Sequence, residues 1–507
     1  MRYKLSLFLI LFFILFSNLH AQKKINYKAS WSDKRPSFPD ELIMVDKVEF
    51  EHEDMKMYCD SAIFNEKENR FTAFGNIYIN QKDTLKIWGD ELYYDGQTKV
   101  AELIGKKIKM KDKNLILETD YLVLERLLNT VRYTNKAIIY DDKSILKSIK
   151  GTYFLDNKDV IFTDKVEIYS DSTEIYSDTM AYNSNTKIAS FYGPTNIINQ
   201  DSTYIYTERG WYNTKSSTSF SSKQGQLINN SRLIQADTFE YSSTTKLGYG
   251  LRNIYIEDSL NNLIITGNSL YIDNNESNPY TYITQIPLVR YFEDQDTLYL
   301  HCDTLLVKYD TSMNMKSLHS FNRVKFYRND IQGFSDILDY SFSDSTLYML
   351  GSPVIWNEDN QIFADTIKMI IKNKIHGFDA YNNSFVIQLA DTINLDKFNQ
   401  IKGKTMKGYF EDNKLYMVDI DGNAESVYFI YEDSKEENEL MGVNIGKGSG
   451  MRVYFEEKKI KKITTFNNPE FFADDIDNIS QEKRLLKGFN NRFYQRPLMP
   501  KDIFILK

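Results

Sequence analysis

The stretch that decides the fold is residues 178–197, DTMAYNSNTKIASFYGPTNI. An apolar segment ends at Tyr182, a turn of small polar residues follows at 183–187, and two further apolar segments flank Gly193. Asn, Ser and Gly tolerate the backbone angles of turns, whereas the β-branched and aromatic residues around them favour strands. The stretch therefore predicts a strand, a polar turn, a strand, a glycine and a further strand.

The same pattern recurs along the chain. Clear copies begin at Asp60, Asp90, Asp237 and Asp336, and in the copies at 60, 90, 178 and 336 a glycine follows the aspartate by 15 residues. Weaker copies begin at Asp120, Gly151, Glu208, Gly267, Asp303 and Asp365. The starts are mostly about 30 residues apart, and a fixed period of this size is typical of a repeat architecture. One unit is too small to bury its own apolar face, so the units are expected to stack.

Within the repeats, apolar and polar residues alternate. Ile108 and Met110 alternate with lysines, and Val324 and Phe326 flank Lys325. A period of two predicts strands with one covered and one wet face, as in antiparallel sheets. The composition agrees, because 14% aromatic residues and only 9 prolines favour ordered β structure over disorder.

The N-terminus predicts export. Arg2 and Lys4 precede an apolar run at residues 5–16, and small and polar residues then lead to Ala21. This is the order of a secretory signal peptide cleaved after Ala21, although an uncleaved anchor stays open. Cleavage leaves 60 Lys and Arg against 70 Asp and Glu, a net charge of −10. With no basic block in the sequence, nucleic acid is excluded as a partner.

The two cysteines, Cys59 and Cys302, lie far apart in sequence. An exported protein permits a disulfide, but such residues are more often buried small apolar side chains. Whether the two pair is left open by the sequence.

Motifs for catalysis are missing. The histidines of the mature chain have no metal-ligand spacing, and neither a nucleophile elbow nor a phosphate-binding loop is present. The sequence therefore predicts no catalytic, cofactor-binding or metal-binding residues and no enzyme. The repeated aspartates are expected to accept hydrogen bonds and tether the corners of the chain, because catalysis needs one special pair rather than a ladder.

One column of the repeat holds bulky side chains. These side chains are interpreted first as residues that pack within the sheets and second as the apolar lining of a channel for lipid tails. The candidates for this lipid groove are Phe64, Tyr94, Leu124, Leu155, Tyr182, Tyr212, Tyr241, Tyr271 and Tyr340.

These motifs resemble a known family. The unit Asp-Thr-x-x-Tyr followed by Thr-Lys and Gly, the FYGPT at 191–195 and the TERGWYNT at 207–214 are similar to OstA-like proteins. These are relatives of the periplasmic lipopolysaccharide-transport components LptA and LptC and of the N-terminal part of LptD. The likeness extends over roughly residues 28–472, and GYFEDNKLYMVDIDGNAESVYFI at 408–430 looks like the later part of such proteins.

The resemblance implies an all-β fold, a repetitive antiparallel β-jelly roll or β-taco, as one long or two consecutive modules. It implies a periplasmic protein, associated with outer-membrane assembly, that shelters the acyl chains of lipopolysaccharide or a related lipid in a hydrophobic groove. Partner modules would join by edge-to-edge β pairing. The expected division is a signal peptide (1–21), a lead-in (22–48), OstA-like repeats (49–300), a second OstA-like section (301–475) and a C-terminal tail (476–507). In this tail, one or two helical turns are expected at 479–487 with Ser480 as the cap, and the rest is expected to lie outside the core.

Two other classes stay open on the residues. One is an outer-membrane β-barrel, whose strands alternate in segments of roughly 10 residues. Charge on the second face of many strands argues against it. The other is a secreted β-solenoid acting on polysaccharides, whose carboxylates would cluster on one rung rather than recur at every corner.

Overall fold

In a computed structural model, the structure describes residues 24–200, 202–229, 231–293, 296–372, 374–390, 397–432, 439–457 and 459–505. The predicted signal peptide, residues 1–21, lies outside the described residues. Of the described residues, 71% lie in strands and 3% in helices, and the strand pairings are antiparallel. The prediction of an all-β, repetitive antiparallel β-jelly roll is confirmed.

Contacts divide the chain into two compact units, Met1–Ser219 (unit 1) and Phe220–Lys507 (unit 2), and each is described by itself. The predicted section boundaries at 48/49 and 300/301 stay predictions.

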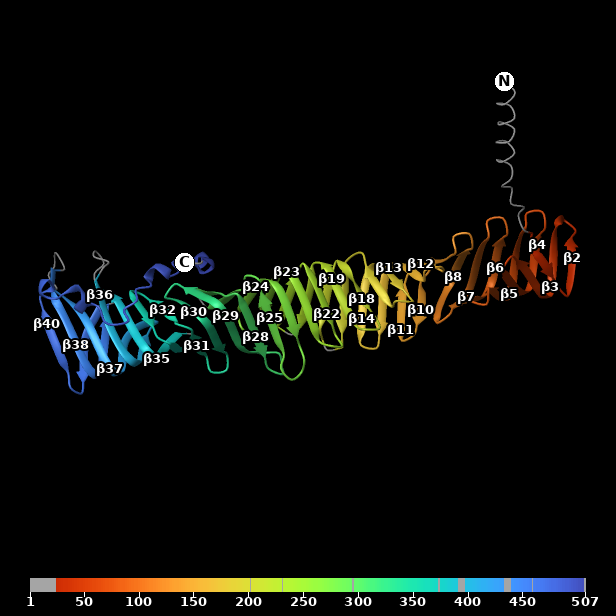
Figure 1. Cartoon of the computed structure of the whole chain (residues 1–507). Helices are drawn as coiled ribbons and strands as arrows, with labels where there is room; N and C mark the ends of the chain where they lie inside the picture. Colours follow the sequence, from red (N-terminus) through yellow and green to blue (C-terminus); the bar gives the residue numbers. More distant parts are fainter. Residues whose placement is uncertain are drawn as a thin grey trace, which may run out of the picture. The chain divides into compact units, whose positions relative to one another are not determined.

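Unit 1 is a row of neighbouring strands (Figure 1). Its strands are β1 (Asn26–Lys28), β2 (Trp31–Arg35), β3 (Phe38–His52), β4 (Met55–Asn65), β5 (Arg70–Gln81), β6 (Leu85–Asp95), β7 (Val100–Asp112), β8 (Leu115–Glu125), β9 (Thr130–Tyr133), β10 (Ala137–Asp141), β11 (Ser144–Ser148), β12 (Lys150–Phe154), β13 (Asp159–Ser170), β14 (Thr173–Asn183), β15 (Ile188–Phe191), β16 (Thr195–Asn199), β17 (Tyr204–Thr207) and β18 (Arg209–Asn213). β19 (Thr218–Lys223) follows at the division between the units. β1, β2 and most of β3 occupy the segment that the sequence predicts as a lead-in.

The long strands bend once near the middle and so contribute to two layers. The pairing of β4 with β5 shifts register between Tyr58 and Ser61, and Asp60 lies in that gap. Phe50 from one side of a bend contacts Phe64 from the other side, with ring centroids 5.8 Å apart. We name the layers by their stretches in unit 1: layer A contains 48–52, 55–58, 77–81, 108–112, 137–141 and 173–177, and layer B contains 61–65, 70–74, 91–95, 121–125, 150–154 and 179–183.

The repeated aspartates hold these bends. Asp60 accepts a hydrogen bond from Asn76 Nδ2 at 2.8 Å, and Asp90 accepts one from the backbone N–H of Lys106 at 2.9 Å. In both cases the donor lies one residue after the glycine of the repeat. The 15-residue spacing therefore places the carboxylate of one bend against the bend of the next strand, and the predicted structural role of Asp60 and Asp90 is confirmed.

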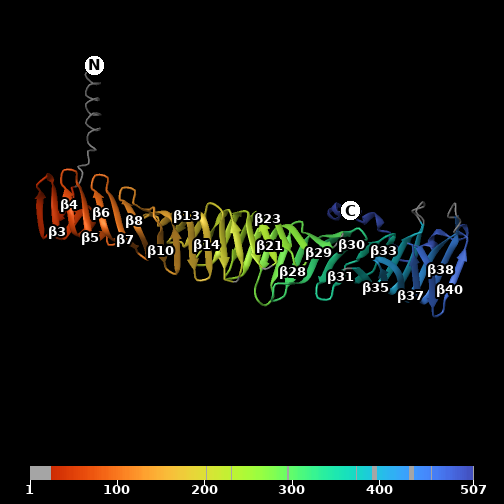
Figure 2. The ribbon, with the colours of Figure 1, turned by 180° about the vertical axis from the view of Figure 1, so that it is seen from behind.

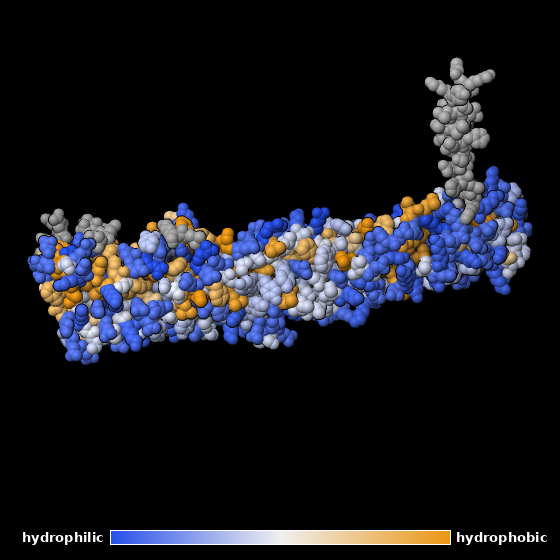
Figure 3. Space-filling view, viewed as in Figure 1, coloured by the Kyte–Doolittle hydropathy of each residue, from blue (hydrophilic) through white to orange (hydrophobic). Residues whose placement is uncertain are grey.

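Unit 2 repeats the two-layer arrangement. Its strands are β20 (Gly225–Asn229), β21 (Arg232–Ala236), β22 (Thr238–Ser242), β23 (Leu247–Asp258), β24 (Leu263–Asp273), β25 (Tyr280–Thr284), β26 (Leu288–Glu293), β27 (Asp296–His301), β28 (Thr304–Tyr309), β29 (Met315–Arg328), β30 (Ile331–Ser341), β31 (Thr346–Leu350), β32 (Val354–Asn357), β33 (Asn360–Phe363), β34 (Thr366–Lys372), β35 (Lys374–Leu389), β36 (Phe398–Glu411), β37 (Lys414–Glu432), β38 (Glu439–Glu456), β39 (Lys459–Phe466) and β40 (Glu470–Asp474). Here layer A contains 288–293, 296–301, 324–328, 331–335 and 384–389, and layer B contains 315–321, 337–341, 346–350 and 366–370. Hydrophilic residues cover much of the visible surface of each unit, as the wet faces of the strands predict (Figure 3).

Replacing Gly351 by alanine is expected to lower the free energy of unfolding of unit 2 by about 1–3 kcal/mol. Gly351 has φ +79°, and a Cβ there would lie 2.4 Å from Asp336 Oδ2. Gly193 in the same column has no heavy atom within 4 Å of such a Cβ, so Gly193→Ala is the matched control. Urea denaturation of the two variants tests this, and equal losses would contradict the account of the bend.

The C-terminal segment, residues 476–505, forms a strap on the outer face of layer A in unit 2. It contains the 3-10 turns η1 (Ile476–Asn478), η2 (Gln481–Arg484), η3 (Phe493–Gln495) and η4 (Pro500–Phe504). Figures 1 and 2 both show it beside β29–β33. The predicted helical turn within 479–487 is present as η2, with Ser480 at its N-cap position. The prediction that the rest of the tail lies outside the core is wrong, because Ile503 is buried.

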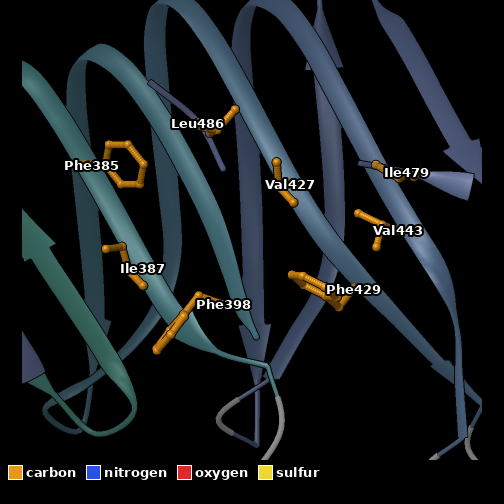
Figure 4. Packing of buried hydrophobic residues seen from close by; sticks show 8 residues of the cluster. All are labelled: Phe385, Ile387, Phe398, Val427, Phe429, Val443, Ile479 and Leu486. Atoms are coloured by element: carbon orange, nitrogen blue, oxygen red, sulfur yellow. The ribbon is translucent and has the colours of Figure 1, made fainter. Parts of the chain in front are cut away.

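Apolar side chains and glutamines fix the strap. Leu486 and Ile479 pack with Phe385, Val427 and Val443 (Figure 4). Three outward-facing glutamines accept hydrogen bonds from the strap. Gln332 Oε1 accepts one from Arg496 Nε at 2.7 Å. Gln361 accepts one from the backbone N–H of Arg492 at 2.7 Å, and Gln400 accepts one from the backbone N–H of Leu486 at 2.8 Å. Layer A is consequently buried on both faces at 384–388.

Candidate functional site

The predicted groove residues mostly share one place, the interior between the layers. Those that are buried there are Phe64, Tyr94, Leu124, Tyr182, Tyr212 and Tyr241, whereas Leu155 is buried in the turn that follows β12. Tyr340 is half-buried and lines a cavity. The side chains at this position of the repeat are therefore closely packed in unit 1, whereas Tyr340 borders a cavity.

Tyr271 does not belong to this set. In β24, Leu270 and Ile272 are buried, whereas Tyr271 lies on the other face against Tyr249, with ring centroids 5.2 Å apart. The bend of β24 ends at Asn268 rather than at Gly267, because pairing with β25 resumes at the next residue. The repeat therefore begins at Asn268, and counting from Gly267 selects Tyr271 instead of the buried Ile272. A shift of one residue along a strand moves a side chain to the opposite face.

Tyrosine, lysine and carboxylate side chains join the two layers of unit 1. Tyr182 donates its O–H to Asp141 at 2.8 Å, and Lys187 Nζ lies 2.7 Å from the same carboxylate. Asp141 ends β10 in layer A and is 2% exposed, whereas Tyr182 and Lys187 come from layer B and its turn. We call this arrangement a clasp, and it joins the two rows of hairpin turns.

The clasp recurs one hairpin earlier. Tyr153 donates to Asp112 at 2.7 Å, and Lys158 pairs with the same carboxylate. Asp112 is the last residue of β7 and is 3% exposed. The tyrosine and lysine are again five residues apart, and the carboxylate again precedes the lysine by 46 residues.

A variant of the clasp surrounds Tyr94. Its hydroxyl lies 2.6 Å from His52 Nδ1 and accepts a hydrogen bond from Arg126 at 3.0 Å. Lys99 pairs with Glu53 at 2.7 Å, which keeps the same spacing of 46 residues. The side chain of Arg126 is 4% exposed, so this network is also withdrawn from water.

Burial changes the acidity of the clasp tyrosines. Burial raises the pKa of Tyr94 to about 12, against the opposing charge of Arg126. Burial also raises the pKa of Tyr153 and Tyr182 well above the ordinary value, and the carboxylates of Asp112 and Asp141 add to the effect. These hydroxyls therefore stay protonated and act as hydrogen-bond donors at neutral pH.

Unit 1 is expected to lose stability as the pH rises from about 10 to 12. The unfolded chain releases tyrosine protons near pH 10, whereas folded Tyr94 holds its proton to about pH 12. The stabilisation is complete below the unfolded pKa and declines toward the folded one, by up to about 2–3 kcal/mol for Tyr94. Urea denaturation at pH 8, 10 and 11 tests this. Tyr94→Phe should show a shallower decline, and an identical pH profile would contradict the prediction.

In unit 2 an apolar cavity of about 280 Å³ lies between the layers. Its lining residues include Val289, Leu298, Leu300 and Phe326 from layer A and Leu338, Tyr340 and Leu347 from layer B. The cavity also touches Leu260, which is 62% exposed at a hairpin turn, so it extends to the surface there. A dry apolar cavity of roughly half this size is large enough to bind benzene.

Charged groups lie at one side of this cavity. Arg328, with a side chain 4% exposed, pairs with Glu293 at 2.7 Å and with Asp330 at 2.6 Å. Burial raises the pKa of Glu293, and the nearby Arg328 charge opposes that rise. Ser345 stands where the clasps of unit 1 have lysine, five residues after the tyrosine.

The family model of OstA-like proteins matches residues 29–178. The predicted resemblance is confirmed over this OstA-like segment, which contains the Asp112–Tyr153–Lys158 clasp and the Tyr94 network.

Other comparisons are weaker. No curated protein matches the chain. Among solved structures, the chain is similar to LptH of Pseudomonas aeruginosa, described as the LptA-homologous periplasmic component of the conserved lipopolysaccharide transport device. The identity is 14%, the match covers 26% of this chain and 76% of that one, and the TM-score is 0.15.

Across the described ranges, no three His, Cys, Asp or Glu residues are placed to hold a metal ion. Cys59 and Cys302 are both free and buried. Within the part of the chain that the structure describes, no helix has the length and apolar character needed to cross a membrane.

The sequence reasoning missed the clasps and the cavity. A signal for the clasps was present, because tyrosine and lysine five residues apart occur at 94/99, 153/158, 182/187 and 241/246, and at 212 and 340 the lysine is replaced by serine. The carboxylate partner is 46 residues from the lysine, more than one repeat away. No local pattern could therefore identify it.

Proposed function

We propose that this protein takes part in lipopolysaccharide transport, without covalent chemistry, and shelters lipid acyl chains between its two β layers. The match of residues 29–178 to OstA-like proteins supports the transport role. The observation that carries the sheltering role is the apolar cavity at Tyr340, which extends to the surface in unit 2.

The physical need for such a site is clear. Each buried CH₂ group of an acyl chain gains about 0.8 kcal/mol relative to water. A long acyl chain therefore cannot leave a membrane unless a protein offers an apolar surface in place of the membrane interior. The lining of Leu298, Leu300, Leu338 and Leu347 offers such a surface, while the polar head of the lipid stays in water.

The inward-facing column belongs to the same proposal. Its residues in unit 1 fill the interior in the structure and would line the continuation of the groove when the layers separate. Export to the periplasm by the N-terminal leader, and cleavage of that leader after Ala21, are part of the proposal.

Partner modules are proposed to add at the ends of the layers. β40 pairs with β38 and carries the exposed Phe471 and Phe472, with 54% and 53% of their surface in contact with water. An edge strand offers unpaired N–H and C=O groups to a further strand, and exposed aromatic side chains add apolar contact. This end of unit 2 therefore suits edge-to-edge pairing with another lipopolysaccharide-transport component.

Photocrosslinking tests the proposal. The photoreactive phenylalanine analogue benzoylphenylalanine replaces Tyr340 in the cavity or, as the matched control, Tyr348 on the outer face of the next strand, which is 40% exposed. With purified lipopolysaccharide, light-dependent adducts are expected at 340 and not at 348. Leu338→Asp should abolish the adducts at 340 by placing a charge in the apolar wall. No adduct at 340 would contradict the proposed function.

A further inference from the structure

The geometry points to a lateral port for the acyl chain. We infer that the Tyr–carboxylate–Lys clasps close the interior of unit 1 at its hairpin edge, and that the interrupted clasp at Tyr340 and Ser345 is where an acyl chain enters unit 2. This inference rests on the proposed function and adds to it the place of entry.

The hairpin edge is the side on which the turns of the two layers meet. In unit 1 the turns of layer A include 53–54, 82–84, 113–114, 142–143 and 171–172, and those of layer B include 66–69, 96–99, 126–129, 155–158, 184–187 and 214–217. A lipid chain that enters sideways must pass between these two rows, because the opposite side of each strand pair is continuous backbone at the bend.

The clasps occupy that passage. Asp141 immediately precedes a turn of layer A, and Lys187 is the last residue of a turn of layer B. Their contact at 2.7 Å, together with the Tyr182–Asp141 bond at 2.8 Å, leaves no width for an acyl chain between the layers at this rung. Asp112 with Tyr153 and Lys158 repeats the closure one hairpin earlier.

The closure fails at Tyr340 for a reason visible in the sequence. Ser345 replaces the lysine, as Ser217 does after Tyr212, but the Tyr212 hydroxyl lies 2.8 Å from Thr173 Oγ1 of layer A. At Tyr340, the short uncharged side chain of Ser345 cannot cross to a carboxylate of layer A. Among the described residues, two carboxylates of layer A at this point, Glu293 and Asp330, pair instead with Arg328 of the same layer. The ion pairs here thus lie within one layer, and the space between the layers is the cavity of about 280 Å³.

The lining defines the class of ligand. Leucine, valine and phenylalanine side chains form the walls, so the inserted part is a hydrocarbon chain. Asn261, Asn262, Ser345 and the Glu293–Arg328 pair are the polar groups of the lining, and they would lie beside the polar head of an amphiphile. The site therefore suits a single acyl chain of a larger lipid rather than a sugar or a peptide.

The test uses the full chain and a palmitic acid that carries a diazirine, with labelled peptides identified by mass spectrometry. On the unaltered protein, labels are expected in 288–300 and 337–350 and at least about tenfold less in 150–191, because the clasps exclude the probe. Purified lipopolysaccharide is expected to compete for the labelling. Equal labelling of the two regions would overturn the port while leaving lipid binding intact.

Two substitutions test the port from opposite directions. Ser345→Lys supplies the missing cation opposite Glu293 and is expected to lower labelling in unit 2 about tenfold, whereas Ser345→Thr retains it. Lys187→Met removes one clasp cation and is expected to raise labelling of the interior of unit 1. Unchanged labelling in both Ser345→Lys and Lys187→Met would overturn the inference. Labelling at the port that lipopolysaccharide does not compete for would instead contradict the proposed function.

Discussion

Replacing Asp141 by leucine is expected to lower the free energy of unfolding of unit 1 by about 3 kcal/mol. The substitution leaves the Tyr182 hydroxyl without its acceptor and Lys187 without its buried partner, although Lys187 still contacts the exposed Asp142 at 2.9 Å. Removing one member of a buried ion pair costs more than the pair contributes, because the other charge stays out of water. Urea denaturation followed by hydrogen–deuterium exchange of peptides from β10–β15 measures the loss.

Three controls separate the buried pair from surface charge. Asp142→Asn removes a carboxylate that is 55% exposed and should change stability by no more than about 0.5 kcal/mol. Tyr182→Phe should cost about 1 kcal/mol, the value of one hydrogen bond. Adding Lys187→Met to Asp141→Leu should recover part of the loss, since no unpaired charge remains. A loss below about 1 kcal/mol in Asp141→Leu would show that the clasp does not hold the layers together.

The second large effect is expected at the strap. The double variant Gln400→Leu and Leu486→Ala should destabilise the attachment of the strap by about 3 kcal/mol. Gln400 accepts the N–H of Leu486 at 2.8 Å and donates to the carbonyl of Arg484 at 2.7 Å, so both backbone groups lose a partner. Leu486 itself is 8% exposed and packs in the apolar cluster.

Trypsin measures this release directly. Lys483, Arg484 and Lys487 lie in the strap, and cleavage requires that it detach. A loss of 3 kcal/mol corresponds to cleavage roughly 100-fold faster. Leu498→Ala is the control, because Leu498 is 72% exposed and its loss should change the cleavage rate by about twofold at most. Equal rates in the double variant and the unaltered protein would contradict the docking of the strap.

The repeat made much of the fold predictable. The aspartate and the glycine 15 residues later mark two neighbouring bends, and the alternation around Ile108 and Met110 correctly gives the buried face. Both signals are local, since they depend on the period of a strand and on the preferences of turn residues. The class and the antiparallel stacking follow from them.

The clasps were out of reach because their partners are not local. Asp112 and Asp141 look like ordinary strand-end carboxylates, and only the pairing of the layers shows that each meets a tyrosine 41 residues later. The open cavity likewise depends on an absence, the missing lysine at Ser345. Aligning the tyrosines of the repeat shows the serine at position 345, but it does not show that a cavity lies between the layers there.

The strap was mispredicted for a related reason. Its apolar residues Ile479, Leu486 and Ile503 follow neither the helical nor the strand period, and prolines at 497 and 500 are typical of an exposed tail. The matching surface consists of Gln332, Gln361 and Gln400, which lie in different strands. Glutamine on the second face of a strand normally indicates solvent, so the docking surface was hidden by the alternation that predicts the rest of the fold.

The central claim is that the interior of unit 2 at Tyr340 receives an acyl chain while the clasps keep unit 1 closed. A crystal structure of the full chain with bound lipid A tests it most directly. The account predicts hydrocarbon density between Leu300, Leu338 and Tyr340, with the Asp141–Lys187 contact still in place. Lipid density confined to the outer faces of the layers, with this interior unchanged and empty, would contradict it.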